Sequence, residues 1–208
     1  MIEAKDLAKS YGKKNVFSSL SFSLPDGGSL VLLGPSGSGK STLLSIVSLL
    51  DSSYEGTLLI DGKDPSALSK KEAEKLRLET FGYVFPDARL LSYLTIKENA
   101  LLPLRLLHRK ADLARLERLA ARLGISELLG RLPREVSEGE RQRAAILRSL
   151  LPSPRCLVAD EPTSHLDFEL AKEAMGLLRE TAKEEKASLI VSTHQEELAA
   201  SFEQAIRL

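Results

Sequence analysis

The sequence predicts an α/β fold in which strands alternate with helices around a central sheet. An apolar run at 30–33 leads through a glycine-rich turn into an apolar helix, which makes one strand–turn–helix unit. After residue 133 the alternation returns, with strands expected at 156–159 and 188–192 and helices between and after them. Strands separated by helices in this way pair in parallel. Short strands closed by turn sequences before residue 61 predict an additional antiparallel part.

The other elements follow from periodicity and from helix-start signals. Ser69 and Glu72 form a capping-box pattern that opens a charged helix. The region 95–129 is leucine-rich and helical, with one stripe that we expect to be core: Leu113, Leu116, Ala120 and Leu123. The expected strands are 1–8, 16–24, 30–33, 57–60, 81–85, 156–159, 188–192 and 205–208, and the other expected helices are 40–50, 168–184 and 195–201.

The segment from Gly34 to Ser41 reads GPSGSGKS and fits the phosphate-binding pattern G-x-x-x-x-G-K-[ST]. The glycines let backbone N–H groups turn inward, and these donors and the positive end of the following helix form an anion site. Lys40 is placed to reach the outer phosphates of a nucleotide, and the Ser41 hydroxyl is placed to bind Mg²⁺. We therefore expect a nucleoside triphosphate to be bound by Gly34, Pro35, Ser36, Gly37, Ser38, Gly39, Lys40, Ser41 and Thr42.

Composition favours one sizeable core and an intracellular protein. Among the 208 residues, Lys plus Arg total 29 and Asp plus Glu total 29, so the basic surplus typical of nucleic-acid binding is missing and no nucleic-acid partner is expected. The single cysteine, Cys156, fits a reducing compartment. The N-terminal residues lack a signal-peptide pattern, and no apolar run is long enough to span a bilayer. We expect a cytoplasmic chain that reaches a membrane through a partner.

Two acids follow the expected strand at 156–159. In phosphate-loop NTPases an acid at the end of a neighbouring strand holds the water shell of the metal, and Asp160 suits that role. Glu161 is placed to activate an attacking water as a general base. Two acids after a strand often only cap the next helix, but the upstream phosphate loop favours the catalytic interpretation.

The order of three further segments resembles the nucleotide-binding subunits of ATP-binding-cassette (ABC) transporters. These segments are VSEGERQRAAILRSLL at 136–151, DEPTSHLD at 160–167 and STH at 192–194. The resemblance covers essentially the whole chain. It implies a single ABC ATPase domain over 1–208, with the P-loop NTPase fold, a mixed sheet core, an N-terminal antiparallel β subdomain and an inserted α-helical subdomain. The core and β subdomain would comprise about 1–85 and 152–208, and the helical subdomain about 86–151.

The resemblance also assigns roles to residues. It implies that Tyr11 stacks on the adenine ring, that His194 contacts the γ-phosphate, and that residues 164–167 cross a dimer interface. Residues 136–140 match the family's signature loop, which contacts the γ-phosphate bound on an opposite subunit. The signature residues concerned are Ser137, Gly139 and Glu140. Nucleotide sites would then form only when two subunits, identical or different, close head to tail.

The sequence departs from the family at two positions. The phosphate-sensing glutamine is replaced by Pro86, which has no side-chain amide to offer to metal or water. The first glycine of the signature pair is replaced by Glu138, whose carboxylate is unfavourable near a γ-phosphate unless it points to solvent. Both changes lead us to expect slow ATP hydrolysis.

Within the family, several segments resemble the lipoprotein-releasing and macrolide-exporter branch, which includes LolD, MacB and FtsE-like ATPases. These segments are 61–64, 66–69, 81–85 and 95–104. The first interpretation is therefore a peripheral ATPase subunit that drives a separate membrane permease, for export or for extraction from the membrane. An alternative is a hydrolysis-impaired, nucleotide-dependent regulatory or scaffolding clamp. A soluble ABC protein acting on DNA or ribosomes is disfavoured, since two cassettes or a coiled-coil arm would be expected.

Overall fold

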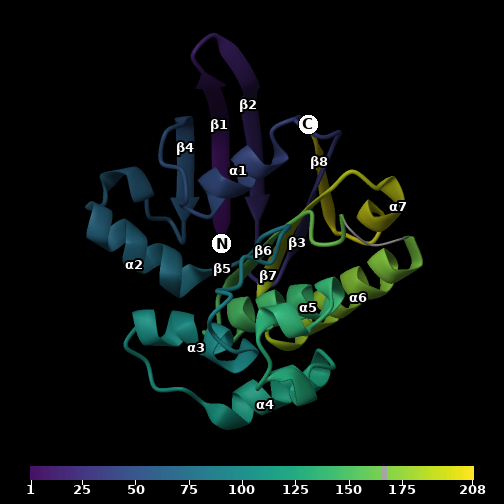
Figure 1. Ribbon diagram of the computed structural model, residues 1–208. Helices are drawn as coiled ribbons and strands as arrows, with labels where there is room; N and C mark the ends of the chain where they lie inside the picture. Colours follow the sequence, from purple (N-terminus) through teal and green to yellow (C-terminus); the bar gives the residue numbers. More distant parts are fainter. Residues whose placement is uncertain (165–167) are drawn as a thin grey trace.

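The computed structural model describes residues 1–164 and 168–208, and it contains two sheets (Figure 1). An antiparallel sheet has the strand order β2–β1–β4, and a parallel sheet has the order β5–β6–β7–β3–β8. The strands are β1 (Ile2–Tyr11), β2 (Lys14–Leu24), β3 (Ser29–Leu33), β4 (Glu55–Ile60), β5 (Phe81–Val84), β6 (Cys156–Asp160), β7 (Ser188–Thr193) and β8 (Gln204–Arg207). The expected α/β fold with an N-terminal antiparallel part is confirmed, and the two kinds of pairing are divided between the two sheets.

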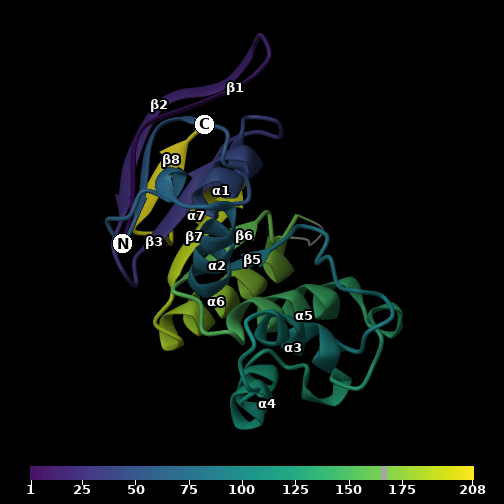
Figure 2. The ribbon, with the colours of Figure 1, turned by 90° about the vertical axis from the view of Figure 1, so that its left-hand side faces the viewer.

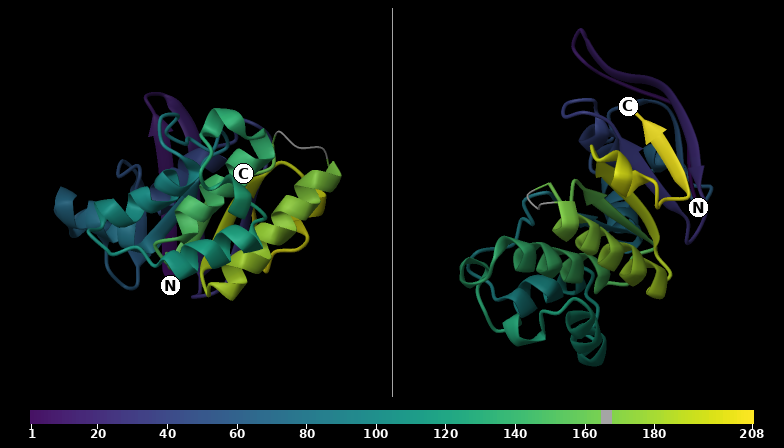
Figure 3. Two further views of the ribbon diagram at one scale, coloured as in Figure 1. Left: turned by 60° about the horizontal axis from the view of Figure 1, so that its bottom comes forward. Right: turned by 90° about the vertical axis from the view of Figure 1, so that its right-hand side faces the viewer.

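The helices of the described residues are α1 (Lys40–Val47), α2 (Lys70–Thr80), α3 (Ile96–Leu106), α4 (Leu113–Arg122), α5 (Glu138–Leu150), α6 (Phe168–Glu184) and α7 (Glu196–Ala199). Short 3₁₀ turns cover Pro65–Ala67, Ser126–Leu128 and Pro133–Glu135. In Figures 1 and 2, α3 and α4 lie at the end of the molecule opposite to the projecting β1–β2 hairpin. Figure 3 shows α5 and α6 on the same side of the parallel sheet.

Two expectations about helices are wrong in detail. The first helix ends at Val47 and not at residue 50, because Leu49 has a positive φ of 60° and the N–H groups of Leu50 and Asp51 both turn back to the Ser45 carbonyl. Leu113 is 50% exposed, because it is the first residue of α4 and lies outside the buried stripe.

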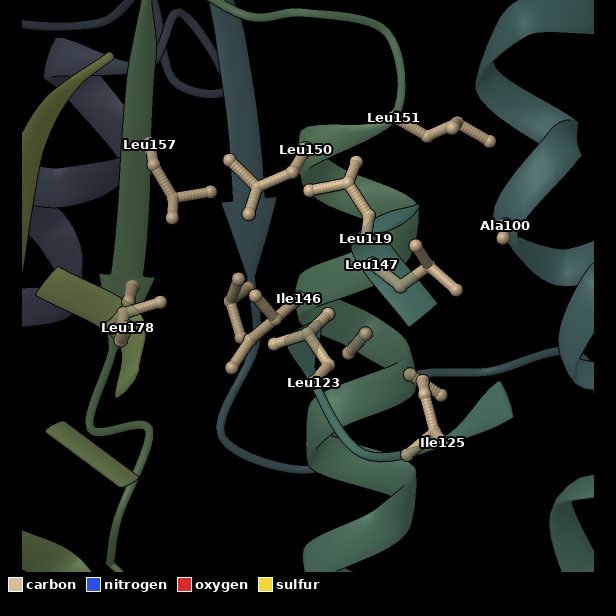
Figure 4. Close-up of a cluster of buried hydrophobic side chains, with 14 of the residues drawn as sticks. Ala100, Leu119, Leu123, Ile125, Ile146, Leu147, Leu150, Leu151, Leu157 and Leu178 are labelled. Carbon is tan, nitrogen blue, oxygen red and sulfur yellow. The ribbon is translucent and has the colours of Figure 1, made fainter. Parts of the chain in front are cut away.

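The parallel sheet separates two hydrophobic cores. On β6, Cys156 and Val158 face a core shared with α1 and the antiparallel sheet, whereas Leu157 and Ala159 face the core of α3, α4, α5 and α6. This division follows from the alternation of side chains along a strand. Figure 4 shows Leu157 pointing toward the leucines of α5. The central strands β3, β6 and β7 are therefore buried on both faces of the sheet.

Gly82 on β5 marks a close approach between this sheet and α5. A Cβ atom there would lie 2.3 Å from the Ser149 carbonyl oxygen, which belongs to backbone and cannot rotate away. We expect Gly82→Ala to lower the free energy of unfolding by about 1–3 kcal/mol through overpacking. Gly176 within α6 is the matched control, because a Cβ there meets nothing within 4 Å. We expect Gly176→Ala to stabilise by about 0.5–1 kcal/mol. Urea unfolding measures both, and a Gly82→Ala protein as stable as the wild type would contradict the packing described.

Candidate nucleotide-binding site

The phosphate loop runs from the end of β3 to the start of α1, as the pattern predicts. Gly37 and Gly39 have φ values of 81° and 103°, which disfavour any residue with a side chain. A Cβ on Gly39 would also lie 2.6 Å from the Val16 side chain of β2. The hydroxyl of Ser38 is buried and has no hydrogen-bond partner among the described residues, so the loop leaves one polar group for a ligand. This arrangement is suited to an anion.

Lys40 is the first residue of α1 and is only 3% exposed. Its ammonium donates hydrogen bonds to the carbonyl oxygens of Gly34 at 2.7 Å and Pro35 at 2.9 Å. Nζ also lies 3.1 Å from the Glu161 carboxylate at the end of β6. The lysine is thus held within the loop, where the phosphates of a nucleotide would lie against it.

Asp160 ends β6 and is buried, at 5% exposure. Its Oδ1 accepts hydrogen bonds from the hydroxyls of Ser41 at 3.0 Å and Ser192 at 2.7 Å. The parallel register pairs Ser192 on β7 with Asp160 on β6, so this contact depends on the two strands being neighbours. Burial, followed by the negative charge of Asp160, raises the pKa of Tyr83 on β5 above its ordinary value, so this phenol remains protonated beside the carboxylate.

Glu161 lies where β6 ends, with a positive φ of 41°. Its N–H donates to the Ser192 hydroxyl at 2.9 Å, which fixes the turn. One carboxylate oxygen meets Lys40, and the other lies 3.5 Å from Nδ1 of His194, whose side chain is 48% exposed. The structure therefore brings Glu161 and His194 to Lys40 in the phosphate loop, and these are the three predicted catalytic side chains.

A cavity of about 490 Å³ opens over this cluster. Tyr11 forms part of its wall, at the end of β1, and Glu161 forms another part. Its remaining lining comes from β2 and the phosphate loop: Lys14, Asn15, Val16 and the run 36–42. The volume and the convergent polar groups are those of a small-molecule site. Gly34 and Pro35 border a neighbouring hollow together with His194.

The signature residues lie elsewhere. Ser137 caps α5 by a reciprocal capping box with Glu140: the Ser137 N–H donates to the Glu140 carboxylate at 2.7 Å, and the Glu140 N–H donates to the Ser137 hydroxyl at 3.3 Å. Hydrogen bonds from Ser137, first from its N–H and then from its hydroxyl, hold the pKa of Glu140 below its ordinary value. Ser137 and Gly139 line a separate cavity of about 300 Å³ and do not line the cavity of about 490 Å³ over the phosphate loop. Glu138 is exposed. Residues 165–167 of the expected interface loop lie outside the described residues.

Pro86 lies in a turn directly after β5, which ends one residue earlier than expected, at Val84. The Ala88 N–H donates to the Phe85 carbonyl at 3.1 Å. Ala88 and Arg89 have φ values of 58° and 44°, and the Arg148 guanidinium of α5 donates to both of their carbonyl oxygens. The loop that follows β5 is thus held by α5, and the proline contributes no side-chain donor to the nucleotide cavity.

Comparison with known proteins agrees with this geometry. The family model described as "ABC transporter" matches residues 17–164. The lipoprotein-releasing system ATP-binding protein LolD 1 of Rhodopirellula baltica is 38% identical over 100% of this chain and 93% of its own length. The ABC transporter ATP-binding protein YxdL of Bacillus subtilis is 38% identical, over 97% of this chain and 80% of that protein.

A solved structure extends the likeness to three dimensions. The dimeric ATP-binding cassette MJ0796 bound to ADP and Pi superimposes with a TM-score of 0.89 and 31% identity, covering 100% of this chain and 94% of that one. The matched family model, the relatives and the phosphate-loop geometry lead to one conclusion. This chain belongs to the ABC transporter family and is one of its ATP-binding, ATP-hydrolysing subunits.

Proposed function

We propose that the chain is a peripheral ATPase that energises a separate membrane permease from the cytoplasmic face of the membrane. The observation that supports this most strongly is that Lys40, Ser41 and Glu161 line one cavity at the phosphate loop, with Asp160 hydrogen-bonded to the Ser41 hydroxyl. No helix among the described residues is long and apolar enough to cross a bilayer. In this proposal the membrane-spanning part of the transporter is a separate permease. Relatives named for lipoprotein release and bacitracin export support export or extraction as the direction of transport.

The oxygen donors at the loop fit Mg²⁺. Ser41 Oγ and Asp160 Oδ1 lie 3.0 Å apart, and a hard cation takes few protein ligands when phosphate oxygens and waters complete its shell. In this proposal Ser41 and Asp160 position the ion, which would neutralise charge on the phosphates when bound. Ser192 holds the Asp160 carboxylate in place through its 2.7 Å hydrogen bond.

The chemical step is assigned to the residues around Lys40. Lys40 and the loop N–H groups stabilise the charge that develops on the transferred phosphoryl group. Glu161 accepts a proton from the attacking water as general base. His194 contacts the γ-phosphate. Its Nδ1 lies 3.5 Å from the Glu161 carboxylate and keeps that carboxylate turned toward the phosphate. Tyr11 stacks on the adenine ring.

A second cassette completes each site in this proposal. Ser137, Gly139 and Glu140 lie at the start of α5, apart from the cavity over their own phosphate loop, so they would serve the nucleotide of a partner subunit. The relative with the superimposable fold is a dimer. A homodimer and a heterodimer with another ABC ATPase both meet this requirement. We also propose that 86–151 acts as the helical subdomain and that about 1–85 and 152–208 form the core.

The variant residues favour one alternative, a clamp that binds ATP and dimerises but hydrolyses it poorly. Pro86 and Glu138 motivate this alternative, whereas the placement of Glu161 and His194 beside the phosphate loop supports the ATPase. A single-turnover assay with purified protein and MgATP separates them. Complete conversion to ADP within minutes supports the ATPase, and persistent bound ATP supports the clamp.

The Pro86 position leads to a further expected result. Proline has no N–H and a fixed φ, so position 86 can offer neither a side-chain amide to the metal nor a backbone N–H to the water. We expect Pro86→Gln to raise steady-state phosphate release about tenfold, since one regained polar contact to a charged site is worth about 1.4 kcal/mol. The measurement uses saturating MgATP. A wild type that is already fast, with a mutant no faster, would show that Pro86 does not limit hydrolysis.

A further inference from the structure

Lys9 is a lysine inside the N-terminal sheet that the nucleotide mechanism does not use. Its side chain is 4% exposed, although it belongs to a strand of the small antiparallel sheet. The register of β1 shifts around Asp6, which has a positive φ of 51°. Before the shift, the even-numbered residues Ile2 and Ala4 face inward. After it, the odd-numbered residues Leu7 and Lys9 face inward, so the shift reverses the alternation of side chains along the strand.

The ammonium of Lys9 is held by the loop that follows α1. Nζ lies 2.8 Å from the Asp51 carboxylate and donates to the Ser53 carbonyl oxygen. The Ser53 N–H in turn donates to Asp51 at 2.8 Å. Burial raises the pKa of Asp51, but hydrogen bonds from Lys9 and Ser53 and the charge of Lys9 outweigh it and hold that pKa below its ordinary value. Asp51 is therefore ionised at neutral pH.

The same pair contacts Tyr11, two residues further along β1. Nζ of Lys9 lies 4.7 Å from the centre of the Tyr11 ring, within the range of a cation–π interaction. The Tyr11 hydroxyl donates to Asp51 at 3.4 Å. Tyr11 as a whole residue is 56% exposed, and it lines the nucleotide cavity. The Tyr11 ring is thus held by the Lys9 ammonium and by the hydrogen bond from its own hydroxyl to Asp51. Much of the residue's surface remains available to a ligand.

We propose that Lys9 and Asp51 are positioning residues that hold the Tyr11 ring in place for the base of the nucleotide. The proposal rests on the function proposed above, in which Tyr11 stacks on adenine. A cation over the ring draws electron density from it, which favours stacking on an electron-rich purine. The hydroxyl contact to Asp51 limits rotation of the side chain, so less conformational freedom is lost when the base binds.

The test compares MgATP with inorganic tripolyphosphate, which has the phosphates but no base, by isothermal titration calorimetry. Loss of base stacking in Tyr11→Ala should weaken ATP binding about tenfold. Lys9→Met, which keeps most of the length of the buried side chain but removes its charge, should weaken ATP binding by about two- to fivefold. Neither change should alter the affinity for tripolyphosphate. In the double variant, Lys9→Met should add no further loss to Tyr11→Ala, because it acts through the ring.

Two controls keep the outcome decisive. Lys5→Met removes an exposed positive charge from the same strand and should leave both affinities unchanged. Circular dichroism reports whether Lys9→Met folds. Asp51→Asn should reproduce the selective loss of ATP affinity, and it tests the same Lys9–Asp51 contact if Lys9→Met does not fold.

The proposal is overturned if Lys9→Met binds ATP like the wild type while Tyr11→Ala is weakened. It is also overturned if the losses of ATP-binding free energy in the two variants add up in the double variant. The same holds if Lys9→Met weakens the binding of tripolyphosphate as much as the binding of ATP. Unchanged ATP affinity in Tyr11→Ala would instead refute the stacking role assigned under the proposed function, and the positioning role with it.

Discussion

Replacing Lys40 with alanine is expected to abolish high-affinity ATP binding. The ammonium is buried in the loop between the Gly34 and Pro35 carbonyls and the Glu161 carboxylate. Without it, the phosphates would face Glu161 with no opposing charge. Loss of charge-assisted hydrogen bonds worth about 3 kcal/mol corresponds to on the order of a hundredfold in Kd.

Titration of a fluorescent ATP analogue measures this affinity. Lys13→Ala is the matched control, because Lys13 is an exposed lysine at the tip of the β1–β2 hairpin and does not line the cavity. Its Kd should match that of the wild type. An unchanged Kd in Lys40→Ala would mean that the phosphate loop is not the nucleotide site.

Glu161→Gln is expected to lower kcat for ATP hydrolysis by about 10²–10⁴-fold, the usual contribution of a general base. The amide keeps the shape of the carboxylate but cannot accept a proton from water. ATP affinity should be retained, because the Lys40 contacts to the loop carbonyls remain. The measurement is phosphate release at saturating MgATP together with a nucleotide titration.

Glu197→Gln is the matched control for Glu161→Gln, because it also removes one carboxylate. Glu197 is exposed on α7, near His194 in the sequence, and does not line the nucleotide cavity. Its turnover should equal that of the wild type. If Glu161→Gln also hydrolysed ATP at the wild-type rate, another group would have to activate the water.

The phosphate loop could be predicted from the sequence because its geometry is local. The pattern from Gly34 to Ser41 dictates where the backbone must turn, and the adjacent strand and helix follow from apolar runs. The helix 168–184 was likewise predicted within its observed bounds, because one amphipathic stripe runs along all of it.

Features that depend on distant contacts could not be predicted in the same way. Lys9 in a strand sequence is expected to face solvent, and only the register shift near Asp6 turns it inward. The helix end at Val47 depends on the positive φ of Leu49, which no local pattern required. The anchoring of Asp160 by Ser192 requires the neighbour order β6–β7, which a sequence does not specify by itself.

In the proposed dimer, each ATP lies between the phosphate loop of one subunit and the signature loop of another. Disulfide cross-linking tests this placement with cysteines introduced at Ser36 and Gly139 in a Glu161→Gln background. The native Cys156 is buried and its pKa is raised by burial, so it should not compete. We expect an intermolecular disulfide with MgATP, and none with MgADP or in either single-cysteine variant. Absence of the cross-link with MgATP, or equal cross-linking without nucleotide, would contradict this placement.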